Sequence, residues 1–371
     1  MKSFTVRLYP TKEQEVLFKK HIGAMRYIYN WALDKNNKLY KEQKKRYSTT
    51  ELGKQLTQYK KEEIWLNEIS NATLQKAIRN LDRAYNNFYK GRSRLPKFKS
   101  KKHSKESFYA RCDYLYFKEN VVNLEKIGKV KYKSSYDIDL TQISKFSNPY
   151  VSFNGRCWVL TFGIDINNPL QELTNKVIGI DLGIKELATC SNNMVFPNIN
   201  KGCIIKKLEK KLRRLQRSVS KKYLNNKKGI HYIKTSNIIK LEKRIRKLYR
   251  KLYNIRQNYI HQVTSIIVKT KPCRVVMENL NISGMMKNKH LSKAIQQQKF
   301  HEFIRQMKYK CEWNSIEFIQ VDRFYPSSKT CSCCGNIKKD LKLSDRTYIC
   351  DKCGLIIDRD LNASINLANY K

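Results

Sequence analysis

The chain has 371 residues, and its 76 Lys and Arg against 31 Asp and Glu give a formal net charge of +45. The length allows about two or three domains, and 41% hydrophobic residues suffice to fill their cores, which excludes a wholly disordered protein. Lys, Arg or Asn interrupts the apolar stretches, and the N-terminus has no continuous apolar segment. We therefore expect no membrane span and no secretion signal, and we place the protein in the cytoplasm.

The positive charge itself indicates an anionic partner. Charges of one sign repel one another in a compact chain, and nucleic acid is the commonest polyanion that neutralises them. Codon bias in an AT-rich genome is an alternative source of the Lys excess, because Asn and Ile are also abundant. The charge favours nucleic-acid binding, and the sequence motifs are needed to distinguish this explanation from codon bias.

The chain opens with a predicted strand and a predicted helix. Phe4, Val6 and Leu8 alternate with polar residues, which is the period of a half-buried strand. Thr11 and Gln14 have the spacing of a capping box, and apolar residues follow at helical intervals. A helical domain over residues 11–103 is therefore expected directly after the strand.

A second strong helix in this domain is predicted over residues 70–89. Apolar residues three and four positions apart form one face of it: Leu74, Ile78, Leu81, Tyr85 and Phe88. Gln75, Lys76 and Arg79 lie on the other faces, so we expect these three residues to contact nucleic acid.

A basic, proline-interrupted stretch over residues 92–103 follows and contains Lys97 and Lys99. It is either a solvated linker or an arm whose lysines follow a phosphate backbone. Residues 108–164 have the composition of strands, and Asn154-Gly155 predicts a tight hairpin turn. Because the opening strand has no partner among the helices, residues 1–10 and 104–170 are expected to form one β module that the helical domain interrupts.

Residues 204–268 predict a long basic helical hairpin. Apolar residues recur three and four apart in both arms, and a polar stretch over residues 220–235 separates the arms. If the arms bury this apolar seam against each other, Arg244, Lys247 and Arg250 face outward. These charges form either a solvated face or a surface for a nucleic-acid duplex, and their single sign favours the duplex.

The strongest local motif is a pair of Cys-x-x-Cys sequences, Cys331 with Cys334 and Cys350 with Cys353, within residues 327–357. Each sequence lets two thiolates reach one metal ion, and together they complete a tetrahedral zinc site of the ribbon type. Four thiolates leave no open coordination position, so a structural zinc is expected, not a catalytic one. Cys333 is left over as a non-ligand.

Acidic residues accompany three apolar segments of this very basic chain. Asp181 lies in a predicted buried strand over residues 177–184 that continues into an antiparallel meander, Glu278 lies in another over residues 273–280, and Asp358 and Asp360 open the last helix. Taken singly, each acid is more often a helix cap or a surface charge. Taken together, carboxylates that converge from separate elements bind Mg²⁺ for phosphodiester cleavage, which is the arrangement of RNase H-type nucleases.

These motifs resemble the TnpB (OrfB) family of insertion-sequence proteins, which are related to type V CRISPR effectors. The matching segments are Arg7-Leu8-Tyr9-Pro10, residues 74–88 and 96–99, Gly179-Ile180-Asp181-Leu182-Gly183, Glu278-Asn279-Leu280, Ser327-Ser328-Lys329-Thr330-Cys331-x-x-Cys334-Gly335 and Cys350-x-x-Cys353-Gly354 with Asp358-Arg359-Asp360-x-Asn362-Ala363. The resemblance covers nearly the whole chain.

The resemblance implies a bacterial or archaeal RNA-guided DNA endonuclease. Such proteins hold a guide RNA derived from the transposon end, recognise a short motif beside the target, and cut double-stranded DNA with Mg²⁺ at one RuvC-type site. The implied catalytic acids are Asp181, Glu278 and Asp360, with Asp358 as a flanking residue. Tyr47 and Gln75 match the positions that read the adjacent motif.

The implied fold is α+β and multidomain. An RNase H-like (RuvC) domain over residues 171–326 and 358–371 carries the inserted helical hairpin and the zinc ribbon. A wedge-like, β-barrel-like module over residues 1–10 and 104–170 is interrupted by the helical recognition domain over residues 11–103.

Three other classes of protein are alternatives to an RNA-guided endonuclease. A single-strand transposase needs paired metal-binding histidines and a Tyr nucleophile, and the six histidines here are scattered without a His-x-His pair. A nuclease-inactive, RNA-guided DNA-binding repressor shares the scaffold, but it is expected to lack at least one of the acids. A non-catalytic zinc-ribbon RNA-binding protein accounts for the charge and the cysteines and leaves the acids on apolar strands unexplained.

Overall fold

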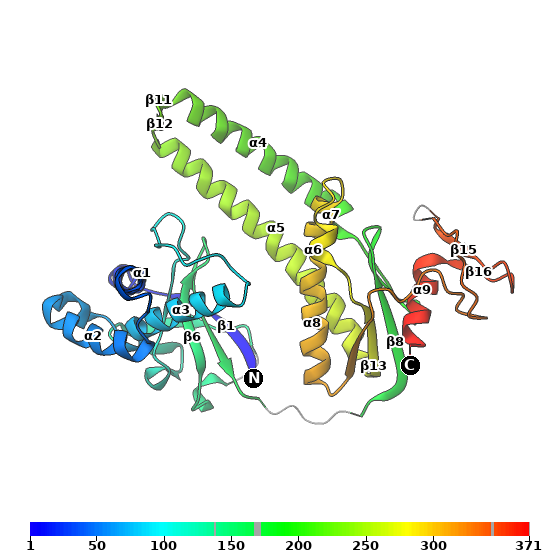
Figure 1. Cartoon of the computed structure of the whole chain (residues 1–371), viewed down its shortest axis with the longest axis horizontal. Helices are drawn as coiled ribbons and strands as arrows, with labels where there is room; N and C mark the ends of the chain where they lie inside the picture. The colour runs from blue at the N-terminus through cyan, green and yellow to red at the C-terminus, as the bar shows by residue number, and fades with distance from the viewer. Residues whose placement is uncertain (137–138, 167–171, 343–344, 371) are drawn as a thin grey trace. The chain divides into compact units, whose positions relative to one another are not determined.

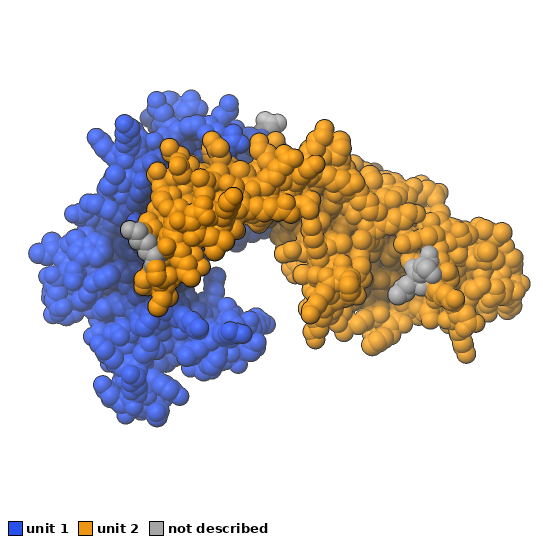
Figure 2. Space-filling view, turned by 90° about the horizontal axis from the view of Figure 1, so that it is seen from above, with its two compact units in different colours: residues 1–167 blue, residues 168–371 orange. Residues whose placement is uncertain are grey.

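The computed structural model describes residues 1–136, 139–166, 172–342 and 345–370. It divides the chain into two compact units, residues 1–167 and 168–371, which are coloured separately in Figure 2. Each unit has its own large hydrophobic core. No helix in the described ranges is long and apolar enough to cross a membrane.

The first unit combines an antiparallel sheet with three long helices (Figure 1). The sheet has seven strands in the order β2-β6-β7-β1-β5-β4-β3. Its strands are β1 (Lys2–Tyr9), β2 (Ser107–Tyr109), β3 (Tyr116–Lys118), β4 (Val121–Leu124), β5 (Gly128–Lys133), β6 (Ser147–Phe153) and β7 (Trp158–Ile164). The helices are α1 (Lys12–Gln43), α2 (Thr49–Glu62) and α3 (Asn71–Tyr89), with the short 3₁₀ helices η1 (Ile64–Glu68), η2 (Cys112–Tyr114) and η3 (Leu140–Gln142).

Local sequence signals account for the start of this unit. The capping box before α1 is confirmed, because the Thr11 side chain accepts a bond from the Gln14 N–H and the Gln14 side chain accepts one from the Thr11 N–H. The predicted turn at residues 154–155 joins β6 to β7, as the Asn154-Gly155 pair indicates. Strand β1 pairs with β7 and β5, so the N-terminal strand lies in one sheet with strands that follow the three helices in sequence.

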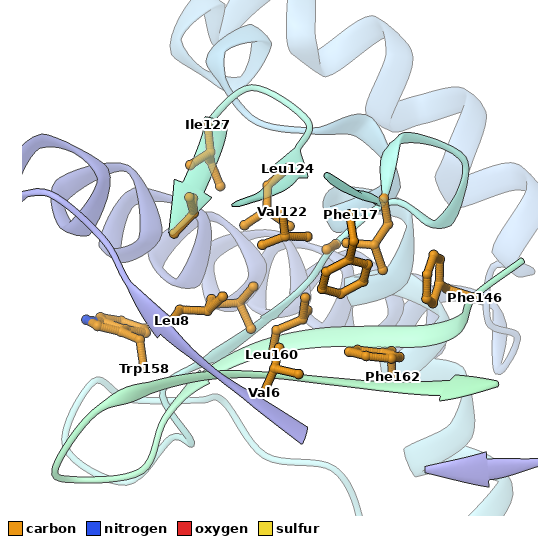
Figure 3. Packing of buried hydrophobic residues seen from close by; sticks show 14 of the residues in the cluster. Val6, Leu8, Phe117, Val122, Leu124, Ile127, Phe146, Trp158, Leu160 and Phe162 are labelled. Carbon is orange, nitrogen blue, oxygen red and sulfur yellow. The ribbon is translucent and has the colours of Figure 1, made fainter. Parts of the chain in front are cut away.

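One core serves both the sheet and the first helix. Figure 3 shows Val6 and Leu8 of β1 beside Leu160 and Trp158 of β7, and Phe18 of α1 belongs to the same buried cluster. Strands β2 and β3 form the two edges of the described sheet and have three residues each. The β-barrel-like module expected from the sequence is therefore open in its hydrogen bonding within the described residues.

The second unit contains a mixed five-stranded sheet in the order β10-β9-β8-β13-β14. Strands β8, β9 and β10 form the predicted antiparallel meander, whereas β13 and β14 run parallel to β8 and to each other. The strands are β8 (Thr174–Leu182), β9 (Glu186–Cys190), β10 (Val195–Pro197), β13 (Pro272–Glu278) and β14 (Glu317–Val321). The helices are η4 (Ile199–Lys201), α4 (Cys203–Asn225), α5 (Ser236–Lys269), α6 (Ile282–Met285), α7 (Ser292–Gln298), α8 (Phe300–Trp313) and α9 (Arg359–Ala368).

Helices cover both faces of this sheet. Ile180 and Met277 point to one face and share a buried cluster with residues of α5 and α8, such as Phe303. On the other face, Val276 packs with Leu367 of α9. The sheet therefore separates a broad apolar core from a narrower layer in which α9 lies against β8, β9 and β13.

Two appendages extend from this core. Helices α4 and α5 form a hairpin, where the sequence predicts one (Figure 1). They bury Ile205, Leu212 and Leu252 along their seam. The short strands β11 (Lys227–Lys228) and β12 (His231–Tyr232) pair at its tip. The cysteine-rich segment contains a small hairpin of β15 (Thr347–Ile349) and β16 (Ile356–Asp358), which leads directly into α9.

Candidate active site and metal centre

Two of the predicted catalytic acids lie on neighbouring parallel strands. Ile180 of β8 is the register partner of Met277 of β13, so the next residues, Asp181 and Glu278, lie side by side across strands that are ~4.8 Å apart. Side chains alternate between the faces of a strand, and Ile180 and Met277 both point into the α5 and α8 core. Asp181 and Glu278 therefore share the opposite face, which α9 covers.

Helix α9 brings the third acid to this face. Asp360 is in its first turn, and the preceding Asp358 is its N-cap, whose carboxylate accepts bonds from the N–H groups of Asp360 and Leu361. The Asp358 carboxylate is thus occupied in starting the helix. This geometry supports the choice of Asp360 over Asp358 as the third acid of the site.

The close approach of α9 to β8 depends on Gly179. A Cβ atom at this position would lie 2.0 Å from the Ser364 carbonyl oxygen and 2.5 Å from the Ala368 nitrogen. Both are backbone atoms of α9, which no change of rotamer can move. The glycine therefore allows the helix backbone to rest on the strand two residues before Asp181.

The surroundings of Asp181 raise the pKa of its carboxyl group. Burial, followed by the negative charges of Glu278 and Asp360, raises the pKa of Asp181 to about 8, while the Arg359 guanidinium opposes the shift. The same guanidinium lies 3.5 Å from an oxygen of Asp360. Without a further cation, Asp181 is mainly protonated at neutral pH, and a divalent cation favours the carboxylate form instead.

The donor set of this site suits Mg²⁺, which prefers carboxylate oxygens and retains several waters. The acids are spread more widely than the ligands of a closed cage. Within the described ranges, the four cysteines described below form a set of Cys, His, Asp or Glu residues whose ligand atoms all lie within 4.8 Å of one another, and the three acids do not form such a set. A wider spacing is compatible with two ions that share carboxylates.

The segment over residues 327–332, which we call the strap, leads into the first cysteine pair and contacts Glu278. The buried Ser327 hydroxyl donates a hydrogen bond to Glu278 Oε1. The Ser327 carbonyl in turn accepts a bond of 2.7 Å from the Asn366 side chain of α9. Asn362, one turn earlier and fully buried, donates to the Thr330 carbonyl at 2.7 Å and accepts from the Ser332 N–H at 3.0 Å.

This strap connects three functional elements. Its residues run from Ser327, which contacts Glu278, to the first cysteine pair, and both asparagines that bind it belong to the helix that carries Asp360. The positions of Glu278 and Asp360 are therefore coupled through one buried hydrogen-bond network.

The four predicted cysteine ligands converge. Their sulfur atoms form one cluster, in which Cys331 and Cys353 are 3.6 Å apart and Cys334 and Cys350 are also 3.6 Å apart. Gly335 and Gly354 follow the two pairs with φ of +73° and +71°, a conformation that favours glycine. Cys333 is exposed and outside the cluster. This all-sulfur set suits a tetrahedral zinc ion.

Two of the predicted nucleic-acid-binding residues share a groove on the first unit. The groove has a volume of about 400 Å³ and is lined by α2 and α3: Thr49, Thr50, Gly53, Lys54, Thr57, Gln75 and Arg79. It combines hydroxyl groups, an amide and two cations. Such a set can bond both base edges and phosphates.

The other residues predicted near this groove do not line it. Tyr47 packs against the helical core, and its N–H bonds to the Asn36 side chain at 2.9 Å. The Lys76 ammonium lies 3.1 Å from Asn148 Oδ1 and 4.7 Å from the centroid of the Tyr109 ring. Tyr47 and Lys76 therefore have structural partners within the first unit.

The remaining predicted basic residues lie elsewhere. Lys97 and Lys99 are in the exposed stretch after α3, where the Lys99 ammonium sits 3.6 Å from the centroid of the Tyr29 ring. Arg244, Lys247 and Arg250 are exposed on α5. These three form a basic stripe along one arm of the hairpin.

Comparisons with known proteins agree with this architecture. Residues 163–289 match a family model described as "Probable transposase" (OrfB_IS605), residues 1–45 match the helix-turn-helix domain of the same group, and residues 300–367 match the Cas12f1-like TNB domain. A protein of Streptomyces pristinaespiralis named "Putative RNA-guided DNA endonuclease" is 30% identical over 371 residues, which cover 99% of this chain and 88% of that protein. This chain belongs to the TnpB (OrfB) family.

Further relatives of this TnpB-family chain support the assignment. The InsQ protein of Escherichia coli K12, which bears the same descriptive name, is 28% identical over 99% of this chain and 91% of its own length. Among solved structures, the complex of Cas12f1 with a single guide RNA and target DNA has a TM-score of 0.63 at 16% identity. That match covers 97% of this chain and 83% of the Cas12f1 chain, and it shows a shared fold.

Several site residues of the TnpB-family chain escaped sequence reasoning. Ser327 is part of a motif that the family resemblance marks, but nothing local indicates that its hydroxyl contacts Glu278. Asn362 and Asn366 are four residues apart in the last helix, and two buried amides on one helical face are a signal that could have been noticed. The α2 side of the groove was missed because helix α2 was not predicted individually.

Proposed function

We propose that this chain is an RNA-guided DNA endonuclease of an insertion sequence, with a transposon-end-derived guide RNA and a double-stranded DNA target as partners. The observation that carries the proposal is the meeting of Asp181, Glu278 and Asp360 on one face of the sheet in a chain of +45 charge. The names of the two relatives support RNA guidance and DNA cleavage.

The chemistry is metal-assisted hydrolysis at a single site in an RNase H-like (RuvC) domain. Asp181, Glu278 and Asp360 hold Mg²⁺, which when bound activates water and stabilises the leaving oxygen of the phosphodiester. Ser327 orients the Glu278 carboxylate by donating a hydrogen bond to its Oε1 atom. Asp358 fixes the start of α9 and with it the position of Asp360.

Other features of the chain contribute to recognition of the guide RNA and the target DNA. The guide RNA supplies sequence specificity by base pairing, while the protein contacts backbones and one short adjacent motif. The α2–α3 groove that holds Gln75 and Arg79 is the surface proposed to read this motif. The stripe of Arg244, Lys247 and Arg250 contacts phosphates, and the four cysteines bind one structural zinc ion.

The test begins with RNA that co-purifies with the protein. Its sequence identifies the guide, and plasmids that carry a matching target beside randomised flanks then report cleavage. Asp181→Ala, Glu278→Ala and Asp360→Ala should each abolish cutting and leave guide-dependent target binding intact. Their matched control is Asp358→Ala, which removes a neighbouring carboxylate and about 1 kcal/mol of helix capping. Because Asp358 fixes the start of α9, this variant should cut more slowly than the unaltered protein, but it should still cut.

Two results would count against the proposal. A dead Asp358→Ala with an active Asp360→Ala would mean that the third acid was wrongly chosen. Guide-dependent binding without any cutting by the unaltered protein would identify the nuclease-inactive repressor instead.

A further inference from the structure

The first unit contains a cavity of about 410 Å³ that the proposed function does not use. It is enclosed by α1, α3, β6 and the segment over residues 98–107. Ile22, Met25 and Ala77 supply an apolar wall, and Phe98 lies at the cavity as a residue that is 58% exposed. An aromatic ring that stays exposed beside an apolar wall offers a face on which a planar ligand can stack.

The Lys and Arg residues that line the cavity carry charges of one sign, and His103 lines it as well. Arg26, Lys99 and Lys105 all line it, and its lining contains no Asp or Glu. Within the described residues, none of these three cations forms an ion pair with a carboxylate, whatever its place in the chain. The charges that line the cavity therefore favour an anionic ligand over a cationic one.

The lining segment is anchored to the helical domain. The Asn30 side chain donates to the Lys99 carbonyl at 2.9 Å and accepts from the Lys99 N–H at 2.8 Å. This two-way bond fixes the backbone between Phe98 and the following residues. The exposed ring and the nearby cations are thus held in a defined arrangement.

Hydrogen-bonding groups complete the site. Asn80 of α3 and Tyr150 of β6 both line the cavity. An amide and a hydroxyl can donate to and accept from the edge of a heterocyclic base. The cavity thus combines a stacking face, an apolar wall, edge-reading groups and cations.

We propose that this cavity binds one unpaired nucleotide, with its base against Phe98 and the apolar wall and its phosphate at Arg26, Lys99 and Lys105. The nucleotide is unpaired because the faces of paired bases are covered within a duplex. The proposal rests on the proposed nucleic-acid function and adds a specific nucleotide site to it. The source is an unpaired nucleotide either of the guide RNA or of the DNA.

Photo-crosslinking of the full-length protein with its co-purified RNA tests the site directly. The complex is prepared with 4-thiouridine in the RNA or with 4-thiothymidine in an added DNA target. A crosslink to residues 98–107 or to Tyr150 supports the proposal, and the label that reacts identifies RNA or DNA as the source. Crosslinks confined to other segments, such as the α4–α5 hairpin, would overturn it.

Variants provide the second readout. Phe98→Ala should weaken binding of the reacting strand by about 5- to 10-fold through lost stacking, whereas Phe98→Trp should retain it. Arg26→Gln should weaken binding more than Arg156→Gln, which removes the same charge from the exposed β6–β7 turn outside the cavity. Equal effects of all four variants would overturn the site. Absence of any RNA or DNA binding by the unaltered protein would instead reject the proposed function as a whole.

Discussion

Gly179→Ala should impair cleavage without touching any residue of the proposed active site. The added Cβ would meet the Ser364 oxygen at 2.0 Å and the Ala368 nitrogen at 2.5 Å, whereas such carbon–oxygen contacts are normally ~3.3 Å or longer. Helix α9 must therefore retreat from β8 by roughly 1 Å. Asp360 moves with the helix, away from Asp181 and Glu278.

The magnitude follows from this displacement. A misplacement of about 1 Å can cost on the order of 100-fold in rate, so the cleavage rate of Gly179→Ala should fall by about that factor. Overpacking should also cost about 1–3 kcal/mol of stability in the second unit. Guide and target binding should persist, because the basic surfaces of the chain do not depend on α9.

The assay compares single-turnover cleavage, target binding and thermal unfolding of Gly179→Ala with those of Gly23→Ala. Gly23 lies in α1, and a Cβ there meets no atom within 4 Å, so this control should cut normally. Cleavage by Gly179→Ala at the rate of the unaltered protein would refute the reasoning. It would mean that the Asp360 position tolerates a shift of the helix or that α9 does not carry a catalytic acid.

Three further predictions concern the strap, the ionisation of the site and the cysteine cluster. Ser327→Ala should lower the cleavage rate by about 10- to 100-fold and raise the Mg²⁺ concentration needed, because a hydrogen bond to a charged group is worth about 1.5–3 kcal/mol. An unchanged cleavage rate and an unchanged Mg²⁺ requirement would contradict this prediction. The pKa of Asp181 is raised to about 8, and Mg²⁺ binds the deprotonated form, so protons should compete with the metal. The Mg²⁺ concentration for half-maximal cleavage should therefore rise as pH falls below 8, by up to about tenfold per pH unit. An Mg²⁺ requirement that is independent of pH would argue against the raised pKa of Asp181. Cys334→Ser should lose the zinc found by metal analysis, whereas Cys333→Ser should retain about one ion per chain, and equal loss from both would show that the ligand set is wrong.

The sequence by itself determined the features that depend on neighbouring residues. The capping box of Thr11 and Gln14, the Asn154-Gly155 hairpin and the meander after β8 are confirmed, because backbone preferences and periodicity act within a few residues. The family was also recognisable, since its motifs are short and each is contiguous. The catalytic roles of the acids remain predictions, although their positions on apolar strands were visible in the sequence.

Only the tertiary structure decided which distant groups meet. Ser327 reaches Glu278 across 49 positions of sequence, and Gly179 is needed because a helix almost 200 residues away rests on it. Lys76 and Gln75 are adjacent in sequence, yet Gln75 lines the groove and Lys76 bonds to Asn148 on another element. Periodicity shows that a helix has several faces, but which face meets the groove depends on how α2, α3 and the sheet pack. That packing is set by the combined burial of all the cores, which no local pattern contains.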